Sequence, residues 1–217
     1  RKESSAASDV YKRQVVIHPE LGNNLFWTRT VNQGDVEKAF KEADAVVETT
    51  LDFARHTGVT LESRGIVADW NKAENKMTIY HNGQAPHMMQ HIIAKHLDLN
   101  EGLVRIVSRD VGGSFGIKVH VYPDEMAVTA ISKKIGRPVK FIADRLESFT
   151  TDIHARCHKI SGKLGVDKNG KILAMEIDDL SGIGPFSMYP RTSAIETNQV
   201  LNLSGAPYVI PNYKAVG

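Results

Sequence analysis

The sequence predicts an α+β fold made of mixed sheets, antiparallel hairpins and a few packed helices. Two observations carry this prediction: β-rich segments come in pairs joined by short polar turns, and other segments place apolar residues at helical spacing. A third is that helices and strands do not alternate strictly, which argues against a purely parallel α/β fold. With 217 residues, of which 41% are hydrophobic and 24% charged, the chain can bury a substantial core.

The N-terminal quarter predicts one helix and one strand. Residues 1–14 are polar, rich in Ser and Ala and aperiodic, so we expect a non-native or disordered lead-in and leave them out of the fold. The first helix is predicted to follow Asp35, whose side chain can cap it. Segment 45–53 is β-branched and predicts a strand. The apolar face of the helix comprises Val36, Ala39, Phe40 and Ala43.

The middle of the chain predicts a hairpin, two helices and two short strands. Segments 65–70 and 76–81 flank a polar turn, and Met77 and Ile79 alternate with polar neighbours as in a half-buried strand. Segment 86–97 predicts a helix, and Gly136 is expected to end a second helix that begins near residue 124. The strands are 103–107 and 138–143. The expected inward faces of the helices are Met88, Met89, Ile92 and Ile93, and Ala127, Ala130, Ile131 and Ile135.

The C-terminal part predicts a second hairpin. Segments 156–166 and 171–178 flank Asn169-Gly170, a dipeptide that favours tight turns. Segment 207–213 is extended. Both ends look cut, so we expect residues 15–217 to be an incomplete region with a sub-boundary near 145–155.

Composition excludes several classes of protein. The net charge of +2 is too small to argue for nucleic-acid binding. The lone Cys157 allows no internal disulfide and no cysteine-held zinc or iron–sulfur cluster, and we expect it to be a small buried or half-buried side chain. No run of roughly 18 apolar residues predicts a membrane span, and no signal core follows the first charges. We therefore expect a cytoplasmic protein.

A glycine-rich loop, residues 109–118, lies between a predicted strand and the second central helix. Three of five consecutive residues from Gly112 to Gly116 are glycines, which lets the backbone approach a ligand closely. Exposed N–H groups in such a loop suit an oxyanion or a metal-bound oxo group. A glycine-rich loop alone is weak evidence, and on these grounds a tight turn that packs a Phe is the favoured interpretation. Its spacing fits neither a triphosphate-binding loop nor a dinucleotide fold.

Other polar residues could form sites, and each also has a structural interpretation. His87 and His91 have the i, i+4 spacing of zinc ligands, with His96 nearby, but they flank an apolar helix face and lack the glutamate of a zinc protease. We interpret His154 and His158 as surface residues or as residues that support a site from outside it. No nucleophile elbow supports a Ser/His/Asp triad.

Several charged residues also have a structural interpretation. Glu62 and Arg64 are interpreted as a structural ion pair. A basic stretch could meet phosphate groups or lie at a solvated sheet edge; it comprises Arg137, Lys140, Arg145 and Arg156.

Several motifs in order resemble the molybdenum-cofactor-binding large subunit of the xanthine dehydrogenase/aldehyde oxidase family. Residues 112–118 match its GGGFGGK-like loop, with Ser114 and Ile117 as departures. Residues 34–44 match "GD…AF..AD", and residues 56–64 match "H…MEPR" with Ser63 in place of Pro. Further matching segments are 82–84, 104–106, 125, 136–140, 144–147, 154–156, 167–172 and 208–212.

The resemblance implies a role for particular residues. Gln84 matches the family glutamine whose amide lies close to molybdenum, and Phe115 and Gly116 match the pair that faces the metal, the glycine N–H being a donor to an oxo group. Gln84 and Phe115 are thus expected near molybdenum without being strong ligands. The expected cofactor-binding residues are Gln84, Gly113, Ser114, Phe115 and Gly116.

The resemblance also implies the reaction and the partners. Family members hydroxylate an aldehyde carbon or a carbon next to nitrogen, with water as the oxygen source, and use a molybdenum–molybdopterin cofactor, for which the cytosine dinucleotide form is one candidate. Iron–sulfur clusters and FAD are expected on partner subunits or domains. The family's catalytic glutamate lies beyond Gly217, so we expect no catalytic residue here and no turnover by this chain alone.

The substrate is narrowed by two positions. Purine-oxidising members have an acidic residue after the loop lysine and an arginine further along; here these positions hold Val119 and, approximately, Gln199. We therefore expect an aldehyde or an N-heteroaromatic substrate rather than xanthine. The alternatives are a non-catalytic binding or assembly module of the same fold and a histidine-based metal hydrolase.

Overall fold

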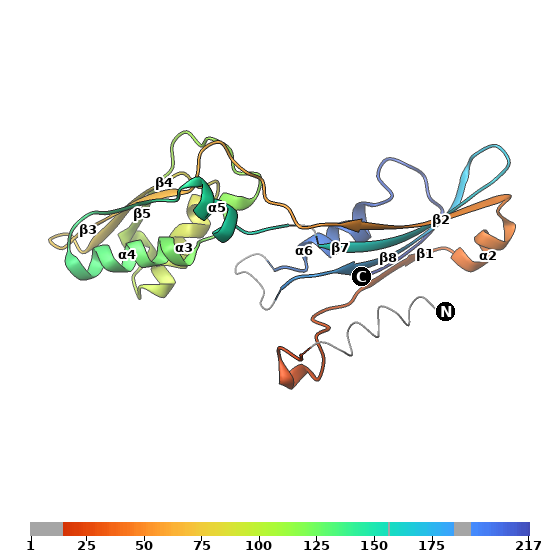
Figure 1. The fold of residues 1–217 in the computed structure, drawn as a ribbon, viewed down its shortest axis with the longest axis horizontal. Coiled ribbons are helices and arrows are strands. Elements are labelled where there is room, and N and C mark those ends of the chain that lie inside the picture. Colours follow the sequence, from red (N-terminus) through yellow and green to blue (C-terminus); the bar gives the residue numbers. More distant parts are fainter. Residues whose placement is uncertain (1–14, 156, 185–191) are drawn as a thin grey trace. The chain divides into compact units, whose positions relative to one another are not determined.

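The structure is a computed structural model that describes residues 15–155, 157–184 and 192–217 (Figure 1). The lead-in expected at 1–14 and the basic residue Arg156 lie outside the described residues. The chain forms two compact units. We call residues 55–155 the central unit, and the described residues before 55 and after 155 the terminal unit. The boundary between residues 54 and 55 was not predicted from the sequence. The terminal unit is formed by two separate segments of the chain, and such a boundary has no local sequence pattern.

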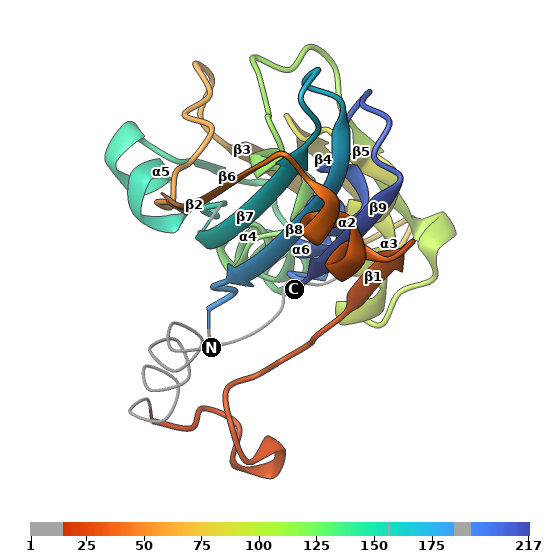
Figure 2. The same ribbon diagram turned by 90° about the vertical axis from the view of Figure 1, so that its right-hand side faces the viewer.

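The terminal unit is built on a five-stranded sheet of order β1-β9-β8-β7-β2 (Figure 2). The predicted hairpin is its centre: β7 and β8 are antiparallel around a turn in which Gly170 has a φ of +79°. β9 pairs parallel with β8 and antiparallel with β1. The strands are β1 (Thr30–Gln33), β2 (Ala45–Phe53), β7 (His158–Val166), β8 (Ile172–Ser181) and β9 (Asn212–Val216).

Two helices pack on opposite faces of this sheet, and a short 3₁₀ helix, η1 (Pro19–Leu21), precedes it. The N-terminal helix α2 (Val36–Glu42) is capped as predicted, because the Asp35 side chain accepts from Lys38 N at 3.0 Å. Its apolar face packs on Ala174 of β8. The helix α6 (Ile195–Leu203) packs Leu201 against Ile177 of β8, whose side chain points to the other face.

The central unit is a four-stranded sheet of order β5-β4-β3-β6 that carries the helices α3 and α4 (Figure 1). β3 lies between antiparallel neighbours, and β4 and β5 pair parallel. Met77 and Ile79 of β4 are fully buried, as their alternation predicted. The elements are β3 (Gly65–Asn71), β4 (Lys76–His81), α3 (Pro86–His96), η2 (Glu101–Leu103), β5 (Val104–Val107), η3 (Ile117–Val119), α4 (Pro123–Ile135), β6 (Val139–Ile142) and α5 (Arg145–Thr151).

The α+β fold class is confirmed, but the predicted inward face of α4 is wrong. Ile131 and Ile135 are 46% and 50% exposed, and the helix instead buries Val128 with three polar residues. Ser132 shows why, since its hydroxyl accepts from Trp70 N and donates to the Arg137 carbonyl. Polar groups with partners inside thus set the rotation of the helix. The buried polar residues are Glu125, Thr129 and Ser132.

Several elements have no counterpart in the sequence prediction: β1, α5 and α6. Each is short or derives its order from distant contacts. Segment 207–213 was expected to be extended, and the strand β9 begins only at Asn212. No helix within the described part of the chain is long and apolar enough to cross a membrane.

The parallel pairing of β4 and β5 decides where two loops meet. Because the strands are parallel neighbours, both carboxyl ends lie at one edge of the sheet. The turn 82–85 follows β4 there, and the glycine-rich loop follows β5. The Ser108 hydroxyl at the start of that loop donates to the Gly83 carbonyl at 2.8 Å. The fold thus brings together segments about 30 residues apart in the sequence.

Replacing Ile79 by Ala tests the central core. Ile79 is fully buried between the sheet and the helices, so the variant should unfold at a lower urea concentration. Its free energy of unfolding should fall by about 2–5 kcal/mol. The matched control is Ile142→Ala in β6, since Ile142 is 62% exposed and its truncation should change stability little. Equal losses in the two variants would contradict the described core.

Candidate functional site

The turn after β4 and the glycine-rich loop are held together by hydrogen bonds around Gln84. Its backbone N–H donates to the Lys118 carbonyl at 3.2 Å. Its side-chain oxygen Oε1 accepts from the Ser114 hydroxyl and, at 3.3 Å, from Gly116 N–H. The neighbouring Gly83 must be a glycine, because a Cβ there would lie 2.3 Å from the His81 ring. The structure therefore brings together the residues predicted from the sequence as the cofactor-binding set.

The loop backbone takes conformations that require its glycines. Gly113 and Gly116 have φ values of +95° and +93°. Between them Phe115, a non-glycine residue, has a φ of +51°, and its side chain is 80% exposed. A bulky residue with this backbone conformation is strained, and such strain persists where the surrounding structure enforces it. Phe115 is thus presented outward and is not a core residue.

Glu62 closes the loop at both ends. Its carboxylate oxygen Oε2 accepts from Gly112 N–H at 2.8 Å and from the Lys118 ammonium at 2.9 Å. Its backbone N–H donates to the Gly112 carbonyl at 3.2 Å. The Lys118 side chain is fully buried, so this carboxylate is the counterion that allows a charged amine there. No local pattern in the sequence predicts this contact, because 56 residues separate the partners.

The contacts of Glu62 change its acidity. Burial by itself raises the pKa of the Glu62 carboxyl, but the hydrogen bonds from Lys118, Gly112 and Asn82 outweigh it. The pKa therefore lies below the ordinary value of 4.5. The carboxylate that clamps the loop is thus stabilised in its charged form.

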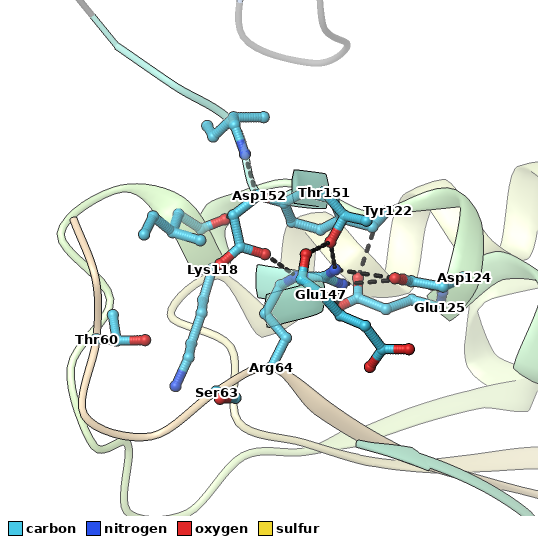
Figure 3. Close-up of polar contacts among 12 residues, drawn as sticks. Thr60, Ser63, Arg64, Lys118, Tyr122, Asp124, Glu125, Glu147, Thr151 and Asp152 are labelled. Atoms are coloured by element: carbon cyan, nitrogen blue, oxygen red, sulfur yellow. Dashed lines mark hydrogen bonds and ion pairs between the residues drawn. The ribbon is translucent and has the colours of Figure 1, made fainter. Parts of the chain in front are cut away.

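Arg64 is the centre of a buried ionic cluster (Figure 3). Its guanidinium binds Asp124 through two nitrogens at 2.9 and 2.8 Å and Asp152 through Nε at 2.6 Å. Glu125 lies 3.3 Å away, and Thr151 also accepts. Burial by itself lowers the pKa of Arg64, but the hydrogen bonds to Asp124 and Asp152 and the charge of Glu125 raise it by more. The pKa of Arg64 therefore lies above its ordinary value.

The cluster reaches the loop through Tyr122. The guanidinium of Arg64 lies 3.7 Å from the centre of the Tyr122 ring, and the Tyr122 hydroxyl donates to the Ile117 carbonyl at 2.9 Å. Burial raises the pKa of the Tyr122 phenol, which keeps the hydroxyl protonated as a donor. On the other side, His81 Nε2 lies 3.1 Å from Glu125. The last residue of β4 and the end of the loop are therefore tied to one buried charge network.

The predicted ion pair between Glu62 and Arg64 is wrong. Glu62 pairs with Lys118, whereas Arg64 pairs with carboxylates that lie 60 to 88 residues later in the chain. Proximity in sequence was the only signal for the predicted pair, and the fold supplied each residue with better-placed partners.

The histidines of the hydrolase alternative do not converge. On α3, His91 Nδ1 lies 2.6 Å from Glu101, and His96 contacts the Ile92 carbonyl, while His87 is exposed. In the part of the chain that the structure describes, no three His, Cys, Asp or Glu side chains are arranged to hold a metal ion.

The interpretation of His158 as a surface residue is wrong, whereas His154 is exposed. His158, in the terminal unit, is 7% exposed and lies 2.8 Å from Asp179 and 3.6 Å from Glu196. The hydrogen bond to Asp179 and the two carboxylate charges raise its pKa. The alternation of side chains along β7 does not predict that α6 covers the strand face on which His158 lies.

The other sequence candidates lie apart from the loop or support it from outside. Lys140 is exposed on the edge strand β6, and Arg137 is exposed just before it, as expected for a solvated sheet edge. Arg145 donates to the Leu61 carbonyl at 2.9 Å. Cys157 is half-buried, as expected. Val119 is buried at 6% exposure, and Gln199 is exposed on α6.

The donors at the loop suit an oxygen-rich ligand. Among the described residues, the N–H groups of Gly113, Ser114 and Phe115 donate to no protein acceptor, and the Gln84 amide nitrogen has no partner either. Neutral donors at a positive-φ loop bind oxyanions or oxo groups without adding charge. The residues present therefore fit a metal–oxo cofactor that brings its own metal ligands.

Comparison with known proteins identifies the family of the chain. Residues 17–217 match the molybdopterin cofactor-binding domain, and the chain belongs to this family. It is 31% identical to the nicotine 6-hydroxylase large subunit of Paenarthrobacter nicotinovorans over 181 residues, which are 83% of this chain and 22% of that protein. The carbon monoxide dehydrogenase large chain of Hydrogenophaga pseudoflava is 32% identical over 77% of this chain and 21% of its own length.

Solved structures have the same fold. Quinoline 2-oxidoreductase from Pseudomonas putida 86 superimposes with a TM-score of 0.87 at 25% identity, over 94% of this chain and 26% of that one. The aldehyde oxidoreductase from Desulfovibrio desulfuricans gives 0.77 at 24% identity and supports the fold alone. The chain spans about a fifth of the length of the curated relatives named here.

Glu62→Gln should alter how stability depends on pH. Because the pKa of Glu62 is lowered in the folded chain, its contribution is full above 4.5 and is lost as the pH falls through the folded-state pKa. The stability difference between the parent and the variant in urea should therefore be larger near neutral pH than in acid. Glu74→Gln, which removes an exposed ion pair, is the control and should show a small difference at both. A difference that does not vary with pH would contradict the clamp.

Arg64→Met should destabilise the central unit strongly. Removing the guanidinium leaves Asp152 and Glu125 buried without their counterion, which costs about 3–5 kcal/mol in thermal or chemical unfolding. Arg64→Lys keeps the charge but loses the multiple contacts, so an intermediate loss is expected. The cluster would be unimportant for stability if the Met variant unfolded like the parent chain.

Proposed function

We propose that this chain is part of the large subunit of a molybdenum hydroxylase that oxidises an aldehyde or an N-heteroaromatic compound with water as the oxygen source. The observation that carries the proposal is the attachment of Gln84 to the loop 112–118, in a chain of the molybdopterin cofactor-binding domain family. Relatives named for nicotine and quinoline oxidation support the N-heteroaromatic class.

The cofactor-binding residues are proposed to be Gln84, Gly113, Ser114, Phe115 and Gly116. A molybdenum–molybdopterin cofactor, for which the cytosine dinucleotide form is a candidate, would supply the two-electron redox chemistry. Gln84 would donate from its amide, and the backbone N–H groups of the loop would orient the group without adding charge. The exposed Phe115 ring would exclude water from one side.

Turnover needs more than these residues. We propose that the catalytic glutamate lies outside this chain, and that iron–sulfur and flavin partners receive the electrons in the cytoplasm. The relatives include a "large subunit" and a "large chain", which supports a multi-subunit assembly. Val119 supports a substrate other than xanthine, because an apolar buried side chain offers no charge to a polar purine.

Metal analysis of the full-length protein tests the proposal. About one molybdenum per subunit, with oxidation of an aldehyde or an N-heterocycle exceeding that of xanthine, is the expected result. Zinc would favour the hydrolase, and no metal would favour the assembly module. Purified residues 1–217 should show no molybdenum-dependent hydroxylation, and detectable turnover by them would overturn the claim that this chain is incomplete for catalysis.

A further inference from the structure

A backbone group favours one orientation of the Gln84 side-chain amide. A backbone N–H can only donate, so the Gln84 atom that faces Gly116 N at 3.3 Å is assigned as the amide oxygen and not the nitrogen. At 3.3 Å this hydrogen bond is long, so by itself it favours one of the two orientations of the amide without excluding the other.

Ser114 strengthens this orientation with a hydroxyl whose own direction is determined. Ser114 Oγ accepts from Lys118 N–H at 3.0 Å, and its single hydrogen is donated to Gln84 Oε1. The residue is only 8% exposed, so water competes little for that hydrogen. Two donors therefore converge on one oxygen of Gln84. The GGGFGGK-like pattern that residues 112–118 resemble has a glycine at the position of Ser114. A glycine there would supply no such hydroxyl.

The nitrogen end of the Gln84 amide is free to contact a ligand. With Oε1 occupied by two donors, the NH₂ group is the part of Gln84 left to contact a ligand, and no described residue accepts from it. If the amide turned over, its NH₂ would face the Gly116 N–H, which cannot accept a hydrogen bond. The hydrogen of the Ser114 hydroxyl would also lose its acceptor in a nearly buried position. The turned orientation of the Gln84 amide is therefore unfavourable, because it loses the hydrogen bonds that Oε1 accepts from Ser114 and Gly116.

We infer that Ser114 is a positioning residue that holds Gln84 with its NH₂ group outward, as a hydrogen-bond donor to the oxygen of the bound cofactor or substrate. The inference rests on the proposed function for the identity of that acceptor, and on the three hydrogen bonds around Oε1 and Oγ for the orientation. It assigns a role to the position at which this loop departs from the family pattern.

The test compares Ser114→Ala with Ser108→Ala in the full-length enzyme. Ser108 is a matched control, because its hydroxyl binds the Gly83 carbonyl next to Gln84 and does not touch the Gln84 amide. Ser114→Ala should lower kcat about tenfold, whereas Ser108→Ala should stay within about twofold. Both variants should keep the molybdenum content of the parent. The Mo(V) electron paramagnetic resonance spectrum should change in Ser114→Ala alone.

A second background separates orientation from a merely structural role. In Gln84→Glu the two side-chain oxygens are equivalent, so either can accept from Ser114 and no orientation remains to be set. Adding Ser114→Ala to this background should cause no further fall in kcat beyond about twofold. A further tenfold loss would overturn the inference, and so would loss of molybdenum from Ser114→Ala or equal effects of the two serine variants.

Neutron crystallography provides a readout that needs no molybdenum. The parent protein should show one Gln84 amide orientation, and Ser114→Ala should show two. Two orientations in the parent would overturn the inference even in an active enzyme. A parent protein without molybdenum but with a single orientation would instead overturn the proposed function and leave the positioning role of Ser114 supported.

Discussion

β4 and β5 of the central unit pair parallel, and the candidate site depends on that one pairing. Parallel strands end at the same edge of a sheet, so the turn with Gln84 and the glycine-rich loop leave the sheet side by side. An antiparallel pairing would have sent them to opposite edges. The covering helices α3 and α4 complete the core beneath the strands and leave that edge to the loops.

Charge is then used to fix the loop. Glu62 joins the first and last residues of the segment 112–118, and its lowered pKa keeps the carboxylate charged while Lys118 is buried. Arg64, two residues later, binds three carboxylates and so joins α4 to the segment around Asp152. Buried charges of this kind are costly unless they are fully paired. Here each of the two buried cations is paired, and the loop that Glu62 closes contains Phe115 with its φ of +51°.

The site is therefore made mostly of neutral donors held by charged supports. Gln84 and the loop N–H groups carry no net charge, while the ionic groups lie at the base and ends of the loop. Such a division suits a cofactor that carries its own metal ligands, since the protein contributes orientation and polarity.

The sequence by itself determined the α+β class, the hairpins, the cap at Asp35 and, through ordered motifs, the loop with Gln84. These follow from periodicity, turn chemistry and local residue order, which a one-dimensional pattern carries. Tertiary structure alone decided the partners of Glu62 and Arg64, the polar inward face of α4 and the burial of His158. These outcomes depend on partners that are mostly far away in the chain, and on which polar groups must be satisfied once the core has closed.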